Sequence, residues 1–356
     1  SLQGFLRANL STTTMGSGMR KCLICHKEET VDDISLIGYD AAIKNKVEEL
    51  TNRLENPVII RDDASKFKRH GLIGKGGFSR VIKVTRPPDK KYYAMKQMSK
   101  KEIKNRKLIN YIKRERDILV AVNFHFVTKL LCCCIDGHSL YFVTELASCG
   151  DFETFLDNHT LDEACARFYI GQVVIALEYF HSATIMHRDI KPPNILVYSD
   201  GYIKVTDFNL ARFLMFGKAF TMCGSPEYMA PEIELNVGYT FTVDWYALGA
   251  VTDEMVNRYL EKFRKEGGQV PEVEQEILAF IKALSEADPK KRLGAEGAQA
   301  IREHPFFSSI NWVTLYMKLY KAPVAKPRAC LLREGDFSDD ELKGVPPTED
   351  FNSFCN

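Results

Sequence analysis

The sequence predicts an α+β chain folded into two lobes: a small lobe with five β-strands and one long helix, and a larger, mainly helical lobe. Its 356 residues exceed the usual size of a single core. Strand character begins at residue 67 and returns over 128–146, and the pattern becomes helical beyond residue 150. We therefore expect an N-terminal extension (1–66), a small lobe (67–146), a large lobe (147–311) and a C-terminal tail (312–356).

Composition excludes several classes of protein. Apolar residues make up 45% of the chain and charged residues 27%, as in ordinary globular proteins. A formal net charge of +1 argues against a basic face that binds nucleic acid. No apolar run approaches the roughly 18 residues of a membrane-spanning helix. With no signal-peptide pattern near the N-terminus, we expect a cytoplasmic or nuclear protein.

The ten cysteines are expected to be reduced thiols, and the Cys132–Cys134 run lies in an apolar stretch that predicts burial. Cys22, Cys25 and His26 have the spacing of half a zinc site. No second pair of ligands follows within reach, so we favour an interpretation without zinc.

One amphipathic helix is predicted in the N-terminal extension, from Ile34 to Leu54. Ile43, Val47, Leu50 and Leu54 recur at helical spacing. We favour a helix packed on the main body of the protein over a coiled-coil partner site, because the segment is too short for several heptads.

The elements of the small lobe follow in order. The segments KFKRHGLI, SRVIKV and KYYAMKQM predict three strands, joined by a glycine-rich turn and by the turn at Pro87-Pro88-Asp89. One long helix is predicted from Lys101 to Val122. Two further strands, over 128–135 and 140–146, complete the sheet.

The large lobe begins with FETFLDNH and LDEACARFYIGQVVIALEYFHSA, two helical segments of which the second is apolar nearly all round and should be buried. A hairpin is predicted to turn at Ser199-Asp200-Gly201. Helices resume from about 243 to 303, and the residues after Trp312 lack periodicity and should wrap a preformed surface.

A glycine-rich loop indicates a phosphate site. Gly74 and Gly76 stand between two strands in GKGGFSRV, where backbone without side chains can approach phosphate oxygens. Ala94 and Lys96 lie two apart on the next strand and share a face. A small residue beside a lysine suits an adenine and its phosphate tail.

Glu115 lies on the apolar stripe of the following helix, between Ile112 and Leu119. A carboxylate on an apolar face is costly unless it is paired. Lys96 is the predicted partner.

The segment MHRDIKPPNILV contains more candidate catalytic residues than any other part of the chain. Asp189 is placed to accept a hydroxyl proton, Lys191 to face a transferring phosphoryl group, and Asn194 to hold a metal ion. Asp207 follows the hairpin and is the second candidate metal ligand. Any one of these residues alone would suggest only a hydrogen-bonded loop, but the ordered set predicts phosphoryl transfer.

In this order, GKGGFSRV, YAMK, HRDIKPPN, DFN and SPEYMAPE resemble the motifs of eukaryotic Ser/Thr protein kinases. ERDILVAVNFHF and HPFFSSINW are similar to segments of the AGC group, and especially of the cyclic-AMP-dependent kinases. The resemblance covers about 67–354. It implies a bilobal kinase fold that binds ATP and Mg²⁺ in a cleft, with the tail wrapping the small lobe.

The resemblance also implies the residues that contact the nucleotide. Thr144 would stand beside the adenine and Asp151 would reach the ribose or a basic substrate residue. The remaining contacts, around the base, at the phosphate loop and at the hinge backbone, would be Ile73, Gly74, Gly76, Val81, Ala94, Leu196, Thr206, Glu145 and Ala147.

Catalysis would then rest on positioning and charge neutralisation, with Lys96 and Glu115 paired and Mg²⁺ held by Asn194 and Asp207. Asp189 would take the substrate's proton beside Lys191. The resemblance further implies a structural ion pair between Glu232 and Arg292, and Asp244 as a brace for the catalytic loop.

Regulation is implied at two places. Thr221 stands where AGC kinases carry an activating phosphate added by an upstream kinase, and Arg188 and Arg212 would bind that phosphate. Phe351 and Phe354 form an FxxF motif expected to pack on the small lobe and steady the Glu115 helix.

The sequence departs from the family pattern at three single positions and in one segment. Ser79 and Asn209 replace glycines, and asparagine tolerates the left-handed or turn backbone expected at 209. Pro193 replaces an acid, which leaves Asp151 and Glu254 to bind a basic residue before the phosphoacceptor. The shortened segment over 255–291 makes a cyclic-nucleotide regulatory subunit an unexpected partner.

Two functions remain open at this point. The first is an active Ser/Thr kinase that acts on protein substrates with basic residues before the phosphoacceptor. The alternative is a weak or inactive kinase-like scaffold that binds nucleotide without turnover. Because Asp189, Asn194 and Asp207 are all present, we favour the enzyme.

Overall fold

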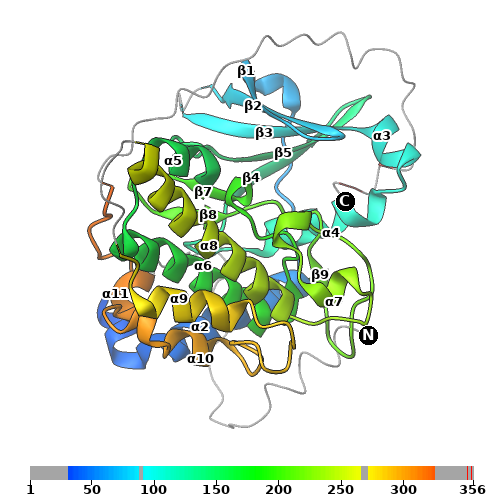
Figure 1. Ribbon diagram of the computed structural model, residues 1–356. Coiled ribbons are helices and arrows are strands. Elements are labelled where there is room, and N and C mark those ends of the chain that lie inside the picture. The colour runs from blue at the N-terminus through cyan, green and yellow to red at the C-terminus, as the bar shows by residue number, and fades with distance from the viewer. Residues whose placement is uncertain (1–30, 88–90, 266–271, 325–350, 352–353, 355–356) are drawn as a thin grey trace.

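A computed structural model describes residues 31–87, 91–265, 272–324, 351 and 354 (Figure 1). The possible zinc ligands at Cys22, Cys25 and His26, the middle of the turn at Pro88 and Asp89, and most of the tail lie outside these residues. No helix in the described ranges is long and apolar enough to cross a membrane.

The small lobe contains the five predicted strands, which form one antiparallel sheet in the order β1-β2-β3-β5-β4 (Figure 1). Its strands are β1 (Lys68–Lys75), β2 (Ser79–Thr85), β3 (Tyr92–Ser99), β4 (Leu130–Ile135) and β5 (Ser139–Glu145). Cys132, Cys133 and Cys134 are buried free thiols on β4, which confirms their predicted state.

The helix predicted from Lys101 to Val122 is two helices, α3 (Lys100–Asn105) and α4 (Ile109–Ala121). The expectation of one helix is wrong because Lys107 has a φ of 56°, a left-handed conformation that interrupts the helical hydrogen bonds. No glycine marks this break in the sequence. The break lets α4 take its own direction along the sheet.

Helix α2 (Val31–Glu55) packs on the main body, as favoured from its sequence, and bends at Gly38. Ala42, Ile43 and Leu50 are buried in the main core. Arg53 donates a hydrogen bond to the carbonyl of Val120 at 3.0 Å. The helix therefore ties α4 to the large lobe.

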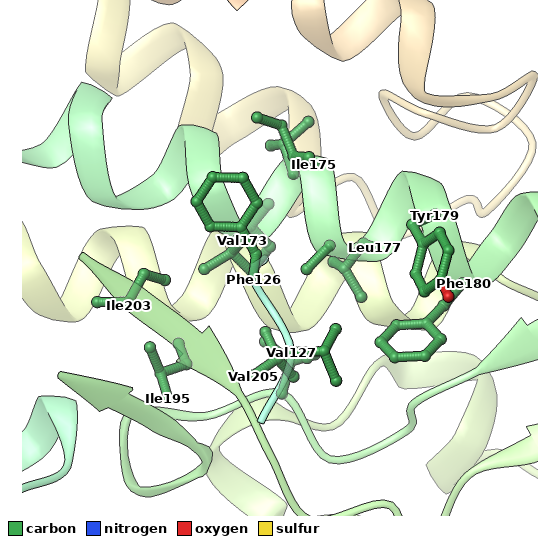
Figure 2. Packing of buried hydrophobic residues seen from close by; sticks show 14 of the residues in the cluster. Phe126, Val127, Val173, Ile175, Leu177, Tyr179, Phe180, Ile195, Ile203 and Val205 are labelled. Atoms are coloured by element: carbon green, nitrogen blue, oxygen red, sulfur yellow. The ribbon is translucent and has the colours of Figure 1, made fainter. Parts of the chain in front are cut away.

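The large lobe is built on α6 (Glu163–Ser182), which is buried along most of its length. Figure 2 shows Val173, Ile175 and Leu177 of this helix beside residues of the hairpin of β7 (Ile195–Val197) and β8 (Ile203–Val205). The predicted turn of that hairpin is present, with Gly201 at a φ of 79°. This packing holds the hairpin, and the residues at both its ends, on a rigid base.

The other elements of the large lobe surround α6. They are α5 (Phe152–Asn158), β6 (Ile185–Met186), η2 (Pro192–Asn194), β9 (Arg212–Phe213), η3 (Pro226–Tyr228), α7 (Pro231–Glu234), α8 (Thr242–Lys265), α9 (Gln275–Leu284), α10 (Ala298–Arg302), η4 (Pro305–Phe307) and α11 (Trp312–Tyr316). A further short turn, η1 (Ala64–Lys66), precedes β1. Between α8 and α9, the described residues 272–274 form no additional helix.

Candidate active site

A cavity of about 410 Å³ lies between the sheet and the large lobe. Both Lys96 and Asp207 line it, so the two groups on which the predicted chemistry depends share one space. Every residue predicted to contact nucleotide or metal also lines it: Ile73, Gly74, Gly76, Val81, Ala94, Thr144, Glu145, Ala147, Asp151, Asn194, Leu196 and Thr206. The wall includes Pro193 and Ser79, two of the positions that depart from the family pattern.

Lys96 is held between two carboxylates. Its Nζ lies 2.6 Å from Glu115 Oε1 and 3.0 Å from Asp207 Oδ1. The predicted pair with Glu115 is therefore present. Strand β3 contributes the lysine, α4 the glutamate and the loop after β8 the aspartate, so the contact joins the two lobes.

Electrostatics favours the charged forms of Lys96 and Asp207. Burial alone would lower the pKa of Lys96, but the charges of Asp207 and Glu115 raise it above its ordinary value. Burial would raise the pKa of Asp207, yet the Lys96 ammonium lowers it below its ordinary value. Burial raises the pKa of Glu115, against the opposing effect of Lys96. A cationic amine beside an ionised Asp207 is suited to bind phosphate and a divalent metal.

The catalytic segment brings Asp189, Lys191 and Asn194 together. Asp189 Oδ2 lies 3.0 Å from Lys191 Nζ and accepts a hydrogen bond from Asn194 Nδ2 at 2.9 Å. The hydroxyl of Ser225 donates to the other oxygen, Asp189 Oδ1, at 2.9 Å. The carboxylate can therefore accept a hydrogen bond from an alcohol, as a substrate serine would require. Sequence reasoning missed Ser225, which is distant in the chain.

Asp244 holds the catalytic segment in place through its carboxylate. It is buried and accepts hydrogen bonds from the backbone N–H groups of His187 at 2.9 Å and Arg188 at 2.7 Å. His181 Nε2 lies 2.8 Å from the same carboxylate, a contact that no sequence signal indicated. Arg188 has a φ of 69°, which is unfavourable for a side chain of this size. The two backbone hydrogen bonds stabilise that conformation.

Replacing Asp244 by asparagine is expected to destabilise the protein by roughly 2–4 kcal/mol at neutral pH, because an amide cannot accept all three hydrogen bonds. Burial opposes ionisation, but the hydrogen bond from His181 and nearby positive charges lower the pKa of Asp244 below its ordinary 3.8. The contribution is thus complete above about pH 4 and is lost as pH falls through the lower, folded-state value.

Urea unfolding of both proteins between pH 3 and pH 8 measures this difference. The gap in unfolding free energy should be constant from pH 6 to pH 8 and shrink below pH 4. A gap that widens on acidification would contradict the assigned role.

Asn209 lies in a turn without a positive φ, so it takes the second of the two conformations expected there. The positive φ, 64°, belongs instead to Asp207, two residues earlier. Asn209 Nδ2 approaches Asp207 Oδ2 at 3.5 Å, at the outer limit of a hydrogen bond. The glycine replacement is accommodated here because position 209 needs no positive φ.

Around Thr221, Arg212 Nη1 lies 3.5 Å from the threonine hydroxyl. Arg188 reaches Tyr239 instead, donating to its hydroxyl at 2.7 Å, and Tyr239 donates to the carbonyl of Thr221 at 2.6 Å. Arg114 of α4 joins the group: burial first, and then the charges of Arg188 and Arg212, lower its pKa. Three crowded arginines make a strong site for an anionic group. Arg114 was not predicted.

Phe351 and Phe354 are both buried and belong to the main core. The Phe354 ring lies 5.8 Å from that of Phe142 on β5, and the guanidinium of Arg116 lies 5.2 Å from its centre. Arg116 also donates a hydrogen bond to the Phe354 carbonyl. Because Arg116 follows Glu115 directly, the FxxF motif contacts the helix that carries the partner of Lys96.

Asp207 and Asn194 supply the hard oxygen ligands that Mg²⁺ prefers, and Mg²⁺ in such sites takes its other ligands from nucleotide phosphates and water. Within the described ranges, no group of three or more His, Cys, Asp or Glu side chains could hold a metal by itself. The donor set thus fits a metal that arrives with a nucleotide.

The structural ion pair predicted between Glu232 and Arg292 is also present. Arg292 Nη1 and Nη2 lie 2.5 Å and 2.9 Å from the two carboxylate oxygens, and both side chains are buried. The pair anchors the segment that follows Thr221 to the base of the large lobe.

Comparison with known proteins agrees with this geometry. Residues 67–307 match the protein kinase domain. The chain is 32% identical to a cAMP-dependent protein kinase catalytic subunit of Dictyostelium discoideum, over 84% of this chain and 49% of that protein. It is 34% identical to human ribosomal protein S6 kinase alpha-1, over 80% and 42%, and 32% identical to the serine/threonine-protein kinase gad8 of Schizosaccharomyces pombe, over 79% and 52%. The chain therefore spans about half the length of these relatives.

Proposed function

The chain belongs to the protein kinase family, with AGC kinases among its relatives, and from this we propose that it transfers the γ-phosphate of ATP to Ser or Thr hydroxyls of protein substrates. The observation that carries the proposal is the convergence of Lys96, Asp207 and Asn194 on one cavity, with Asp189 hydrogen-bonded to Asn194 at its edge. The presence in the chain of every charged group that phosphoryl transfer requires supports the proposal.

We assign each residue of the site a role that follows from its position. Lys96, oriented by Glu115, binds the nucleotide phosphates, and Asn194 and Asp207 would hold Mg²⁺, which neutralises phosphate charge when bound. Asp189 accepts the proton of the substrate hydroxyl, as it accepts the hydrogen bond of Ser225. Lys191, 2.7 Å from Ser225, places positive charge beside the transferring group.

Incubation of the purified protein with γ-labelled ATP, Mg²⁺ and a serine peptide with preceding arginines tests the proposal. We expect label on the peptide serine, in proportion to enzyme. Binding of an ATP analogue with no transfer to any peptide would favour the nucleotide-binding scaffold instead.

We further propose that an upstream kinase phosphorylates Thr221 and thereby activates the enzyme. A phosphate on Thr221 would contact Arg212 directly, and Arg188 and Arg114 would lie near it. These arginines connect α4, the catalytic segment and the loop carrying Thr221, so the phosphate would order all three.

The Thr221→Ala variant should have a kcat about 10- to 100-fold lower than that of wild-type protein phosphorylated at Thr221, because its arginine cluster lacks the anion. Peptide kinetics on phosphorylated wild-type and Thr221→Ala protein measure the effect, with Thr240→Ala as a matched threonine control. Equal activity of the phosphorylated wild type and the alanine variant would refute this form of activation.

A further inference from the structure

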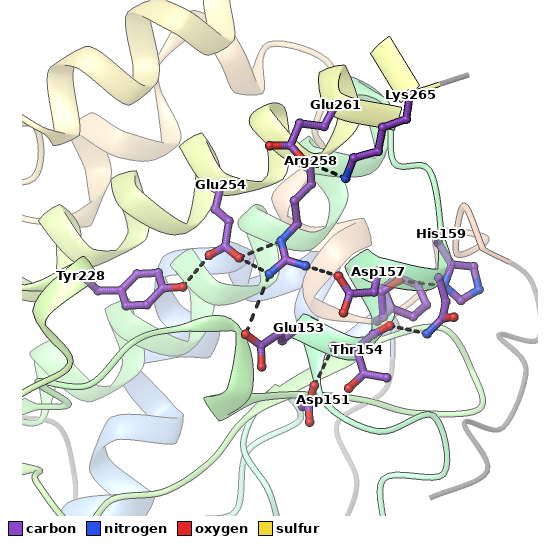
Figure 3. A network of polar contacts seen from close by, with 12 residues as sticks. Asp151, Glu153, Thr154, Asp157, His159, Tyr228, Glu254, Arg258, Glu261 and Lys265 are labelled. Carbon is purple, nitrogen blue, oxygen red and sulfur yellow. Dashed lines mark hydrogen bonds and ion pairs between the residues drawn. The ribbon is translucent and has the colours of Figure 1, made fainter. Parts of the chain in front are cut away.

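A guanidinium group already occupies the acidic cluster beside the candidate active site (Figure 3). Arg258, in the final turns of α8, lies 2.6 Å from Glu254 Oε1 through Nη2 and 3.9 Å from Glu153. It also forms an ion pair with Asp157. We call Arg258, Glu254, Glu153 and Asp157 the Arg258 cluster.

Within this cluster both carboxylate oxygens of Glu254 already accept hydrogen bonds from groups of the protein itself. Its Oε1 accepts from Arg258, including Nε at 2.8 Å, and its Oε2 accepts from the Tyr228 hydroxyl at 2.5 Å. Glu254 is also the least exposed of the three carboxylates, at 23%, compared with 50% for Glu153 and 64% for Asp157. The carboxylate best shielded from water is thus already paired.

The cluster lies where a peptide substrate must approach. Tyr228 is three residues after Ser225, whose hydroxyl donates to Asp189. On the other side, Asp151 lines the nucleotide cavity and caps α5, the helix that carries Glu153 and Asp157. A second cavity, of about 650 Å³ and lined by Tyr228, Glu254 and Arg258, leaves room for a long side chain beside the cluster.

We propose that Arg258 determines substrate specificity by occupying the acidic subsite that an arginine of the substrate would otherwise enter. This rests on the proposed kinase function. To bind Glu254, an arginine of the substrate would have to displace Arg258. Because Arg258 belongs to the same helix as Glu254, its effective concentration at that carboxylate is always high. Selection for basic peptides then depends on Asp151, which accepts a hydrogen bond from Thr154 N but pairs with no cation that the structure records.

The test compares two serine peptides, one with arginines two and three residues before the serine and one with alanines there. For each protein the ratio of kcat/KM for the two peptides measures selection for arginine. Replacing Arg258 by methionine keeps the aliphatic stem and frees Glu254, so this ratio should rise about fivefold or more. Adding Glu254→Gln to that variant should cancel the rise.

Lys265→Met is the matched control, since Lys265 lines the same cavity but pairs with Glu261 and leaves the Arg258 cluster intact. It should leave the ratio unchanged. Arg258→Lys, which restores a cation, should return the ratio toward that of the wild type, and the wild type should show little preference.

An unchanged ratio in Arg258→Met, or an equal rise in Lys265→Met, would overturn the role of Arg258 while leaving the kinase activity standing. Absence of transfer to both peptides by the wild type would overturn the proposed function itself, and with it this inference.

Discussion

Replacing Asp207 by asparagine should lower the rate of phosphoryl transfer about 1,000-fold or more. The change keeps the size of the side chain but removes the charge that would hold Mg²⁺ and that lies 3.0 Å from Lys96. Peptide phosphorylation measures the rate. Thermal unfolding with ATP, in the presence and absence of Mg²⁺, reports separately on metal binding, and the Mg²⁺-dependent part of the stabilisation should disappear in the variant.

Asp200→Asn is the control for this experiment. Asp200 lies at the turn of the same β7–β8 hairpin and forms an ion pair with Lys318, away from the cavity. Its replacement should leave both readouts within twofold of the wild type. If Asp207→Asn transferred phosphate as fast as the wild type, the assignment of the site would be wrong.

The largest effect on stability is expected at Arg292. Arg292→Met should lower the unfolding free energy by about 3–5 kcal/mol, because Glu232 would keep a buried charge without its partner. Arg292 is 1% exposed and Glu232 is 3% exposed, so water cannot replace the lost contacts. The carbonyls of Thr242 and Glu286 would lose hydrogen bonds as well.

Urea unfolding of single and double variants distinguishes this cause from simple loss of packing. Adding Glu232→Gln to Arg292→Met removes the unpaired charge and should recover part of the stability, so the double variant should be more stable than Arg292→Met. Lys291→Met, an exposed neighbour, should change stability by no more than about 0.5 kcal/mol. A double variant less stable than Arg292→Met would contradict the electrostatic explanation.

Local patterns predicted the elements of this protein well wherever the elements had strong periodicity. The strand-forming segments bounded by turn residues and the apolar run of α6 are properties of neighbouring residues, so they can be read along the chain. The break at Lys107 could not, because a lysine has no intrinsic preference for a left-handed backbone. There the packing of α4 against its neighbours, among them α2, prevails over local preference.

Some contacts of the candidate site could likewise be predicted from local sequence and others could not. The pairing of Lys96 with Glu115 was predictable, since a carboxylate on an apolar helical face requires a cation. Ser225 beside Asp189 and His181 beside Asp244 were not, because an exposed-looking serine or histidine gives no local sign of its distant partner. The presence of Arg114 in the cluster around Thr221 could not be predicted for the same reason.

The sequence by itself determined which chemical groups this protein has and the order in which it presents them, and these indicated phosphoryl transfer. Only the tertiary structure decided the pairings that no local pattern indicates, such as that of Arg258 on α8 with Asp157 on α5. The sequence indicated that Glu254 could bind a substrate's arginine. In the structure, Arg258, four residues later on the same face of α8, pairs with Glu254 and also with Asp157 of α5. Pairing between residues of different elements depends on distances in space, and separation along the chain does not specify those distances.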